Sequence, residues 1–269
     1  MTENTTDWKY TTVEKQGRIA IVRFDRGVAP NPLSLDAMQE LTAVARHLDE
    51  DLETSVVVLT GRADNFSMGF DLKDPGSVAM RSAPMQQRRK LLQTGPRMCK
   101  AWEDLEQMTI CALEGWCVGG GVALAVSLDL RVMGEDSTLY VSEIERGMNM
   151  SWNSVPRFVN LCGPAKTKRV VVMAERIKAA RALDWGLADE VTPNGGALDK
   201  AMEMAERIAA LPPVQVRMCK KDVDVAAKAL NHAVSFMDLD QYALSQTSED
   251  YKEGIDSFLE KRPPVWKGA

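Results

Sequence analysis

The chain has 269 residues, of which 45% are hydrophobic and 26% charged, and its formal net charge is −5. This length allows a sizeable core, and the acidic balance argues against general binding to nucleic acid or to an anionic membrane. The first ten residues, MTENTTDWKY, lack a basic region followed by an apolar segment, and no apolar run is long enough to span a bilayer. We therefore expect a cytoplasmic protein without nucleic-acid or membrane partners.

Predicted strands and helices alternate in the first part of the chain. Residues 8–25 indicate a hairpin that turns near Gln16, residues 34–51 a helix capped by Ser34, and residues 54–61 a short buried strand. The next predicted elements are a mostly polar helix over 85–108, a strand over 109–115, a buried helix led by glycines 119–121, and a strand over 128–134. This alternation predicts an α/β fold with a mostly parallel sheet.

The strand signal nearly disappears after Gly163. Helical segments are predicted over 164–186, 198–212, 213–246 and 249–264, separated by Gly or Pro. We expect an α/β core over residues 1–195 and a helical C-terminal region over residues 196–269 that takes part in oligomerisation.

Cysteine and histidine usage limits the possible chemistry. The cysteines, at positions 99, 111, 117, 162 and 219, have no metal-binding spacing, and His47 and His232 are the only histidines. We expect reduced, mostly buried thiols, no metal site, and histidines that are solvated or packed rather than part of a nucleophile triad. Carboxylates and backbone amides remain as the groups that carry the chemistry.

Two glycine-containing segments are candidate sites. EGWCVGGGVALAVSLDLRV, residues 114–132, places three glycines before an apolar helix whose first amides have no partner within the helix. It matches neither GxGxxG nor a P-loop, which leaves a carbonyl ligand or simple close packing. In NFSMGFDLKD, residues 65–74, Gly69 opens the backbone and Asp71 is suited to hold the turn. Two N–H groups converging from these segments would form an oxyanion hole.

Both segments, together with LYVSEIERGM, KAARALDWGLADEV and the tail SEDYKEGIDSFLEKRPP, resemble the crotonase superfamily of enoyl-CoA hydratases, isomerases and relatives. The resemblance runs from about residue 8 to the C-terminus and keeps the order of the motifs. It implies a spiral of ββα units, a homotrimer or homohexamer, and an acyl-CoA thioester as substrate with no further cofactor. It also implies an oxyanion hole formed by the backbone N–H groups of Phe70 and Gly120.

Hydratases of this superfamily typically use two glutamates. The corresponding positions in this chain are Ala123 and Glu143, so the resemblance implies a single catalytic glutamate. The sequence around Glu143 also fits a capping box, with Ser142 as cap and Glu145 as its reciprocal partner, which leaves Glu143 free. Our first hypothesis is addition of water, or of a closely related nucleophile, to an enoyl-CoA thioester. Double-bond isomerisation by the same glutamate is the second, and acyl-CoA binding without catalysis is the third.

Other single-glutamate or related members of the superfamily fit less well. Hydroxycinnamoyl-CoA hydratase-lyases carry tyrosines and a serine at places where this chain has Pro75, Ala123 and Phe236. Members that displace halogen use an aspartate where this chain has Ser151. Neither activity is predicted.

The remaining site residues are expected from the resemblance and from their side chains. Trp152 is bulky for its place in the loop, so it shortens the acyl pocket, forms a flat wall for a cyclic or aromatic acyl group, or packs beneath the loop. Asn149 and Asn153 are suited to hold water or a substrate hydroxyl. Met68 and Ala123 complete the expected substrate pocket.

Coenzyme A is expected to contact the backbone around residues 26–33 and 66–72. Arg26 lies in the first of these ranges. Lys261 and Arg262 are expected near the phosphates, from the same or a neighbouring subunit, although a cationic tail is also a common solvated end.

Overall fold

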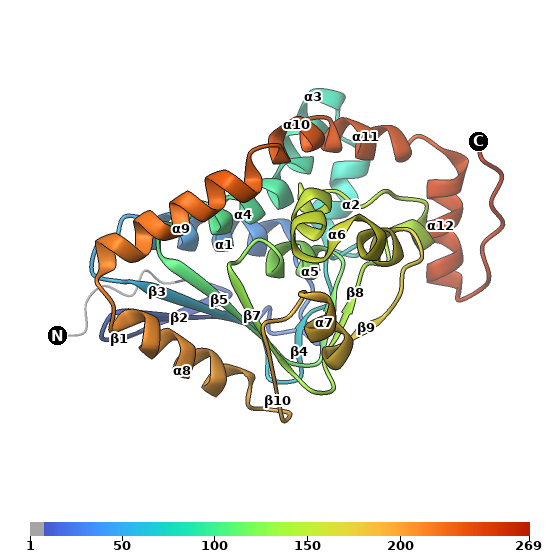
Figure 1. Cartoon of the computed structure of the whole chain (residues 1–269). Helices are drawn as coiled ribbons and strands as arrows, with labels where there is room; N and C mark the ends of the chain where they lie inside the picture. Colours follow the sequence, from blue (N-terminus) through green and yellow to red (C-terminus); the bar gives the residue numbers. More distant parts are fainter. Residues whose placement is uncertain (1–7) are drawn as a thin grey trace.

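The computed structural model describes residues 8–269 and is built on a six-stranded sheet (Figure 1). Its strands lie in the order β1-β2-β3-β5-β7-β10. They are β1 (Thr11–Gln16), β2 (Ile19–Phe24), β3 (Val56–Thr60), β5 (Met108–Leu113), β7 (Leu130–Gly134) and β10 (Glu190–Thr192). β1 and β2 form the predicted antiparallel hairpin, and every other pair in this sheet is parallel. The predicted α/β fold with a mostly parallel sheet is confirmed.

A second, smaller sheet was not predicted from the sequence pattern. Its order is β4-β6-β8-β9. The strands are β4 (Asn65–Ser67), β6 (Trp116–Val118), β8 (Thr138–Tyr140) and β9 (Ile177–Lys178). β4, β6 and β8 each follow a strand of the main sheet and precede helical segments, which is the repeated ββα unit that the resemblance implied. Strands of two or three residues are too short to show a period of two, so the sequence pattern misses them.

The helices cover both faces of the main sheet. They are α1 (Leu35–Asp49), α2 (Pro75–Ser82), α3 (Met85–Leu92), α4 (Thr94–Glu103), α5 (Gly120–Ala125), the 3-10 turn η1 (Ile144–Arg146), α6 (Ser154–Val171), α7 (Ala179–Trp185), α8 (Ala197–Ala209), α9 (Pro213–Lys228), α10 (Asn231–Ser235), α11 (Asp238–Ser245) and α12 (Glu249–Glu260). The Ser34 side chain caps α1 by accepting from Ala37 N–H, as predicted. α1 packs against α4, where the Trp102 indole donates to the Leu41 carbonyl. None of the helices described here is long and apolar enough to cross a membrane.

Three predicted helices are wrong in extent. The helix expected over 85–108 is two helices followed by β5. Pro96 is the cause, because it lacks an N–H and its ring would clash with the Leu92 carbonyl in a continuous helix. The segment expected to be helical over 164–186 starts earlier, at Ser154, bends at Gly163 (φ 76°, ψ 167°), and is then interrupted by β9.

The long helix expected over 213–246 is divided into α9, α10 and α11. Contacts with α6 and its preceding loop accompany these breaks: the Asn160 side chain donates to the Ala227 carbonyl near the end of α9, and Asp238 accepts from Asn153 N–H at the start of α11. No Gly or Pro marks either break, so the sequence pattern could not reveal it.

The helices of the C-terminal region contact different parts of the molecule. α8 packs on the main sheet, where Ala197, Ala201 and Ala205 are fully buried against β3, β5 and β7. α9, on the side of the main sheet opposite α8, continues into α10 and α11, which lie over α3 and α6, and α12 lies at the far end of the molecule (Figure 1). α12 packs closely on η1, because a Cβ at Gly254 would lie 2.3 Å from the Arg146 carbonyl carbon. The expected boundary at residue 195 stays a prediction.

Candidate active site

The two glycine segments converge at the start of α5. A Cβ on Gly69 (φ 77°) would lie 2.5 Å from the Val118 carbonyl oxygen and 3.2 Å from the Gly120 nitrogen, so only glycine permits this approach. Gly120 is the first residue of α5, and its N–H therefore has no carbonyl partner within the helix. The structure thus brings the two predicted segments together, whereas their binding of a carbonyl oxygen stays a prediction.

The Phe70 loop is held by a short bridge to Leu33. Leu33 N–H donates to the Gly69 carbonyl (2.7 Å) and Asp71 N–H to the Leu33 carbonyl (2.9 Å), which leaves the Phe70 N–H outside the pairing. Asp71 accepts from Lys73 N–H (3.0 Å) and holds the turn as predicted. Arg26 approaches the Asp71 carboxylate at 3.6 Å.

Asn31 supports this loop and was not identified from the sequence. Its fully buried side chain donates to the Phe24 carbonyl (3.1 Å) and the Phe66 carbonyl (2.9 Å), and its own carbonyl accepts from the Ser67 hydroxyl. Its backbone is left-handed, with φ 62°. The signal was present, since asparagine between two prolines favours a turn and tolerates that conformation.

Glu143 lies between β8 and η1 with its carboxylate against the first glycine of the triplet. A Cβ on Gly119 would lie 2.5 Å from Oε1. Although the residue is partly exposed, its Oε2 is buried and has no hydrogen-bond partner. Desolvation raises the pKa of Glu143 to about 7, and the nearby Arg146 charge opposes this only in part. A carboxyl group with such a pKa can give and take a proton near neutral pH.

The capping box predicted around Glu143 is wrong. The element is a 3-10 turn of three residues that ends at Gly147 (φ 65°), and its N-cap residue is Glu143, without a side-chain cap bond. Glu145 accepts instead from the Tyr140 hydroxyl, and the Ser142 carbonyl accepts from Arg146. So short a turn does not need the reciprocal cap of a full helix.

Trp152 lies beside the same glycines. A Cβ on Gly120 would lie 2.6 Å from the indole, and a Cβ on Gly95 at the start of α4 would lie 2.1 Å from it. The indole meets the Phe70 ring edge to face, with centroids 6.4 Å apart. Its backbone is left-handed (φ 62°), which costs a bulky residue on the order of 1–3 kcal/mol.

The other expected pocket residues are not all in one place. The Oδ1 atom of Asn149, like the Oε2 atom of Glu143, is buried and has no hydrogen-bond partner among the residues described. Ala123 is fully buried in α5, where its N–H donates to the Gly119 carbonyl, and Met68 remains 37% exposed. Asn153, in contrast, lines a separate charged cavity, whose lining does not include Glu143.

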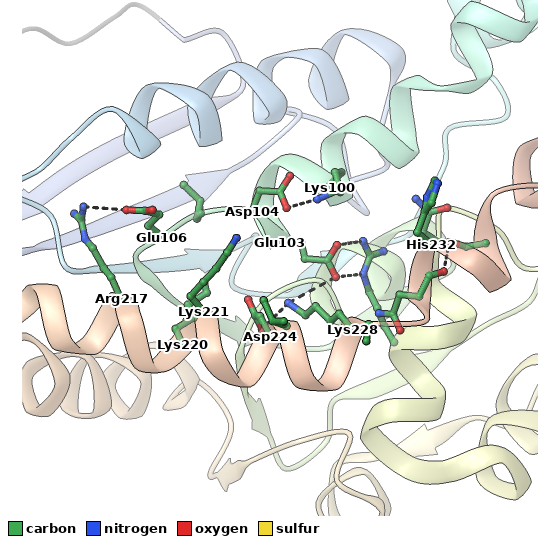
Figure 2. Close-up of a pocket in the computed structure, with 17 residues that line it drawn as sticks. Lys100, Glu103, Asp104, Glu106, Arg217, Lys220, Lys221, Asp224, Lys228 and His232 are labelled. Carbon is green, nitrogen blue, oxygen red and sulfur yellow. Dashed lines mark hydrogen bonds and ion pairs between the residues drawn. The ribbon is translucent and has the colours of Figure 1, made fainter.

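That charged cavity, of about 390 Å³, lies mainly between α4 and α9 (Figure 2). Glu103 accepts two hydrogen bonds from Arg157, at 2.9 and 2.8 Å, and both side chains are largely buried. Burial alone would raise the pKa of Glu103, but the hydrogen bonds and charge of Arg157 outweigh it and lower the pKa. The ion pairs Lys100–Asp104 and Arg217–Glu106 also face this space. The charges within these three pairs therefore neutralise one another.

The three residues expected to bind coenzyme A lie in two places. Arg26 follows β2 and is within reach of the Phe70 loop through Asp71. Lys261 and Arg262 follow α12, where Arg262 donates to Glu253 and Glu260. Arg262 also lines a hollow of about 510 Å³ with residues of η1 and the tail. No contact described in residues 8–269 joins Arg26 to Lys261 or Arg262, and their shared role stays a prediction.

The thiols are poor candidates for the chemistry. All five cysteines are free, and Cys99, Cys111 and Cys117 are buried, as predicted. Burial raises the pKa of Cys99 to about 11, so its reactive thiolate is scarce at neutral pH.

Known proteins of one family resemble this chain in sequence and in fold. A family model described as enoyl-CoA hydratase/isomerase matches residues 14–269. The chain is 28% identical to a short-chain-enoyl-CoA hydratase of Clostridium acetobutylicum, over 93% of this chain and 94% of that protein. It is 28% identical to (E)-benzylidenesuccinyl-CoA hydratase of Thauera aromatica, over 96% and 99%. A crystal structure of carnitinyl-CoA hydratase from Mycobacterium avium is similar, with a TM-score of 0.84 and 27% identity over 97% of this chain and 99% of that one.

Proposed function

Because the chain belongs to the enoyl-CoA hydratase/isomerase family, we propose that it adds water to an enoyl-CoA thioester with Glu143 as its only catalytic carboxylate. The observation that carries the proposal is the position of this carboxylate. It lies against Gly119, next to the start of α5, with Oε2 buried and without a hydrogen-bond partner. An enzyme maintains such an unpaired group only at a cost in stability, which favours a catalytic role.

The proposed reaction proceeds through an enolate. The thioester oxygen accepts hydrogen bonds from the N–H groups of Phe70 and Gly120, each worth on the order of 3 kcal/mol in the transition state. Ionised Glu143 takes a proton from water while the water oxygen bonds to C3 of the enoyl group, and the electron pair of the double bond moves toward the thioester. Protonated Glu143 then returns its proton to C2, which collapses the enolate to the hydroxyacyl product.

Water needs a second polar contact in this scheme, because Ala123 has no side chain that can accept a hydrogen bond. The buried, unpartnered Oδ1 of Asn149 supports Asn149 as the group that orients the water. We therefore place Asn149 beside Glu143 in the proposed site. Asn153 lines the charged cavity, and its proposed contact with substrate has less support.

Double-bond isomerisation is the second candidate, and Ala123 is the observation that favours it. An isomerase needs one group to remove a proton at one carbon and return it at another, so a single glutamate suffices. A mass-spectrometric screen of enoyl-CoA thioesters separates the candidates. Hydration adds the mass of one water, isomerisation changes chromatographic retention without a change of mass, and a protein that only binds acyl-CoA produces neither change.

We further propose a homotrimer or homohexamer formed through α9, α10 and α11. Large apolar side chains that are mostly exposed gather on α9 to α11 and the turns between them: Val214, Met218, Val223, Val225, Leu230, Val234, Phe236 and Leu244. A group of exposed large apolar side chains such as this favours contact with another subunit over contact with water. Light scattering coupled to size exclusion measures the number of subunits, and a monomer at micromolar concentration would contradict this part of the proposal.

A further inference from the structure

We infer that Trp152 is the fixed end wall of the acyl site and limits this enzyme to short acyl groups. The inference rests on the proposed function, because it assumes that an acyl-CoA thioester binds with its carbonyl at Phe70 and Gly120. It selects one of the roles that the sequence left open for Trp152 and adds the contacts that hold the ring in place.

The Trp152 ring lies against the starts of two helices. Gly95 and Gly120 open α4 and α5, and a Cβ on either glycine would lie within 2.6 Å of the indole. The Phe70 ring meets it edge to face. The indole therefore fills the space between two helix starts and the residue that supplies the other proposed N–H donor.

The glycines at the start of α5 have different neighbours. Consecutive glycines face different groups, since Gly119 lies against the Glu143 carboxylate and Gly120 against the indole. An acyl chain whose carbonyl is held at Gly120 and whose reacting carbons face Glu143 meets the indole soon after those carbons. A four-carbon chain ends before the ring, whereas a longer chain needs the space that the ring occupies.

The Trp152 ring cannot move aside easily. Arg157 donates to the Trp152 carbonyl (2.8 Å) and is itself held by Glu103 through two hydrogen bonds. Asp238 of α11 accepts from the next N–H, that of Asn153 (2.8 Å). These contacts hold two successive non-glycine residues in the left-handed conformation, with φ 62° and 56°. Moving the loop would break contacts to a largely buried ion pair, so the indole is a wall and not a flexible lid.

The test is acyl-chain selectivity of binding, measured by isothermal titration with butyryl-CoA and octanoyl-CoA, which lack the double bond and do not react by hydration. Trp152→Gly removes the ring and suits a positive φ. Trp152→Phe retains part of the ring and serves if the glycine variant does not fold. Ala174→Gly is the matched backbone control, because Ala174 also has a positive φ (48°) but lies in the turn after α6.

We expect wild type and Ala174→Gly to bind butyryl-CoA at least about tenfold more tightly than octanoyl-CoA. In Trp152→Gly the octanoyl affinity should rise by about fourfold for each methylene that the opened space buries, and the butyryl affinity should change little. The octanoyl-CoA affinity of Trp152→Phe should lie between those of wild type and Trp152→Gly. Equal gains in affinity for butyryl-CoA and octanoyl-CoA in Trp152→Gly would overturn the inference about Trp152 but not the proposed function. Wild type that binds octanoyl-CoA as tightly as butyryl-CoA would do the same. Failure of wild type to bind any CoA thioester would overturn the proposed function, and this inference with it.

Discussion

Two glutamates near the Trp152 loop have opposite electrostatic surroundings. Glu143 has a buried oxygen without a partner and a pKa raised to about 7, whereas Glu103 is paired with Arg157 and its pKa is lowered. A buried carboxylate that serves structure is compensated, because an unpaired charge away from water is costly. The missing compensation at Glu143 supports the catalytic role that we propose for it, whereas the pairing of Glu103 with Arg157 holds the loop in place.

Removal of the compensated glutamate should produce the largest change in stability. Glu103→Gln leaves the buried Arg157 guanidinium without its counter-charge, so we expect a loss of about 3–5 kcal/mol in the free energy of unfolding. Urea denaturation measures this loss. Asp104→Asn is the matched control, since it breaks the exposed pair with Lys100 and should cost no more than about 1 kcal/mol. Equal effects of the two substitutions would show that burial of the Glu103 pair has no special weight.

Removal of the uncompensated glutamate should instead stabilise the protein at high pH. The folded-state pKa of about 7 exceeds the ordinary value of 4.5, so the folded state binds more protons between these values and wild-type stability falls as pH rises through that window. Glu143→Gln avoids the buried charge and should be the more stable protein above pH 7. The advantage is at most about 3 kcal/mol and disappears near pH 4.

The difference between the two unfolding curves isolates Glu143, because Asp238, whose pKa burial raises to about 6, titrates in both proteins. A Glu143→Gln variant that is less stable than wild type at pH 8 would indicate a structural role for the carboxylate.

Restoration of the second carboxylate is expected to lower stability and to raise hydration activity. Ala123→Glu places a larger side chain at a fully buried position of α5, so stability should fall by roughly 1–3 kcal/mol. Hydration of crotonyl-CoA, followed by loss of the enoyl absorbance, should rise from a poor wild-type rate, and one pKa of the carboxylate pair should increase. Efficient wild-type hydration together with a slower folded variant would show that position 123 is not a functional gap.

The sequence predicted the main architecture because long elements leave clear signals. The hairpin, the Ser34-capped helix and the buried strands of the main sheet all extend over several residues with a regular apolar pattern. The small sheet consists of strands of two or three residues, and the breaks in the C-terminal helix follow contacts made by Asn160 and Asp238 from distant parts of the chain. Such features depend on tertiary structure and leave little local signal.

The candidate site was predicted in the same uneven way. Gly69 and the glycine triplet were visible as backbone signals, and the structure brings them together. The surroundings of Glu143 were not visible in the sequence, because burial of a carboxylate oxygen without a hydrogen-bond partner is a property of the folded chain. The sequence also did not reveal on which side of the loop Asn153 lies. Its backbone is left-handed, and the residue lines the charged cavity.

The most direct test of the central claim is turnover of an enoyl-CoA panel by wild type and Glu143→Gln, with Glu145→Gln as the control. Glu145 is exposed and contacts Tyr140 at the end of β8, so its substitution should leave turnover within a few-fold of wild type. We predict that Glu143→Gln lowers turnover by at least about 100-fold while acyl-CoA binding stays nearly intact. Equal losses in both variants that follow their melting temperatures, or a Glu143→Gln enzyme as active as wild type, would contradict the assignment of Glu143 as the catalytic acid and base.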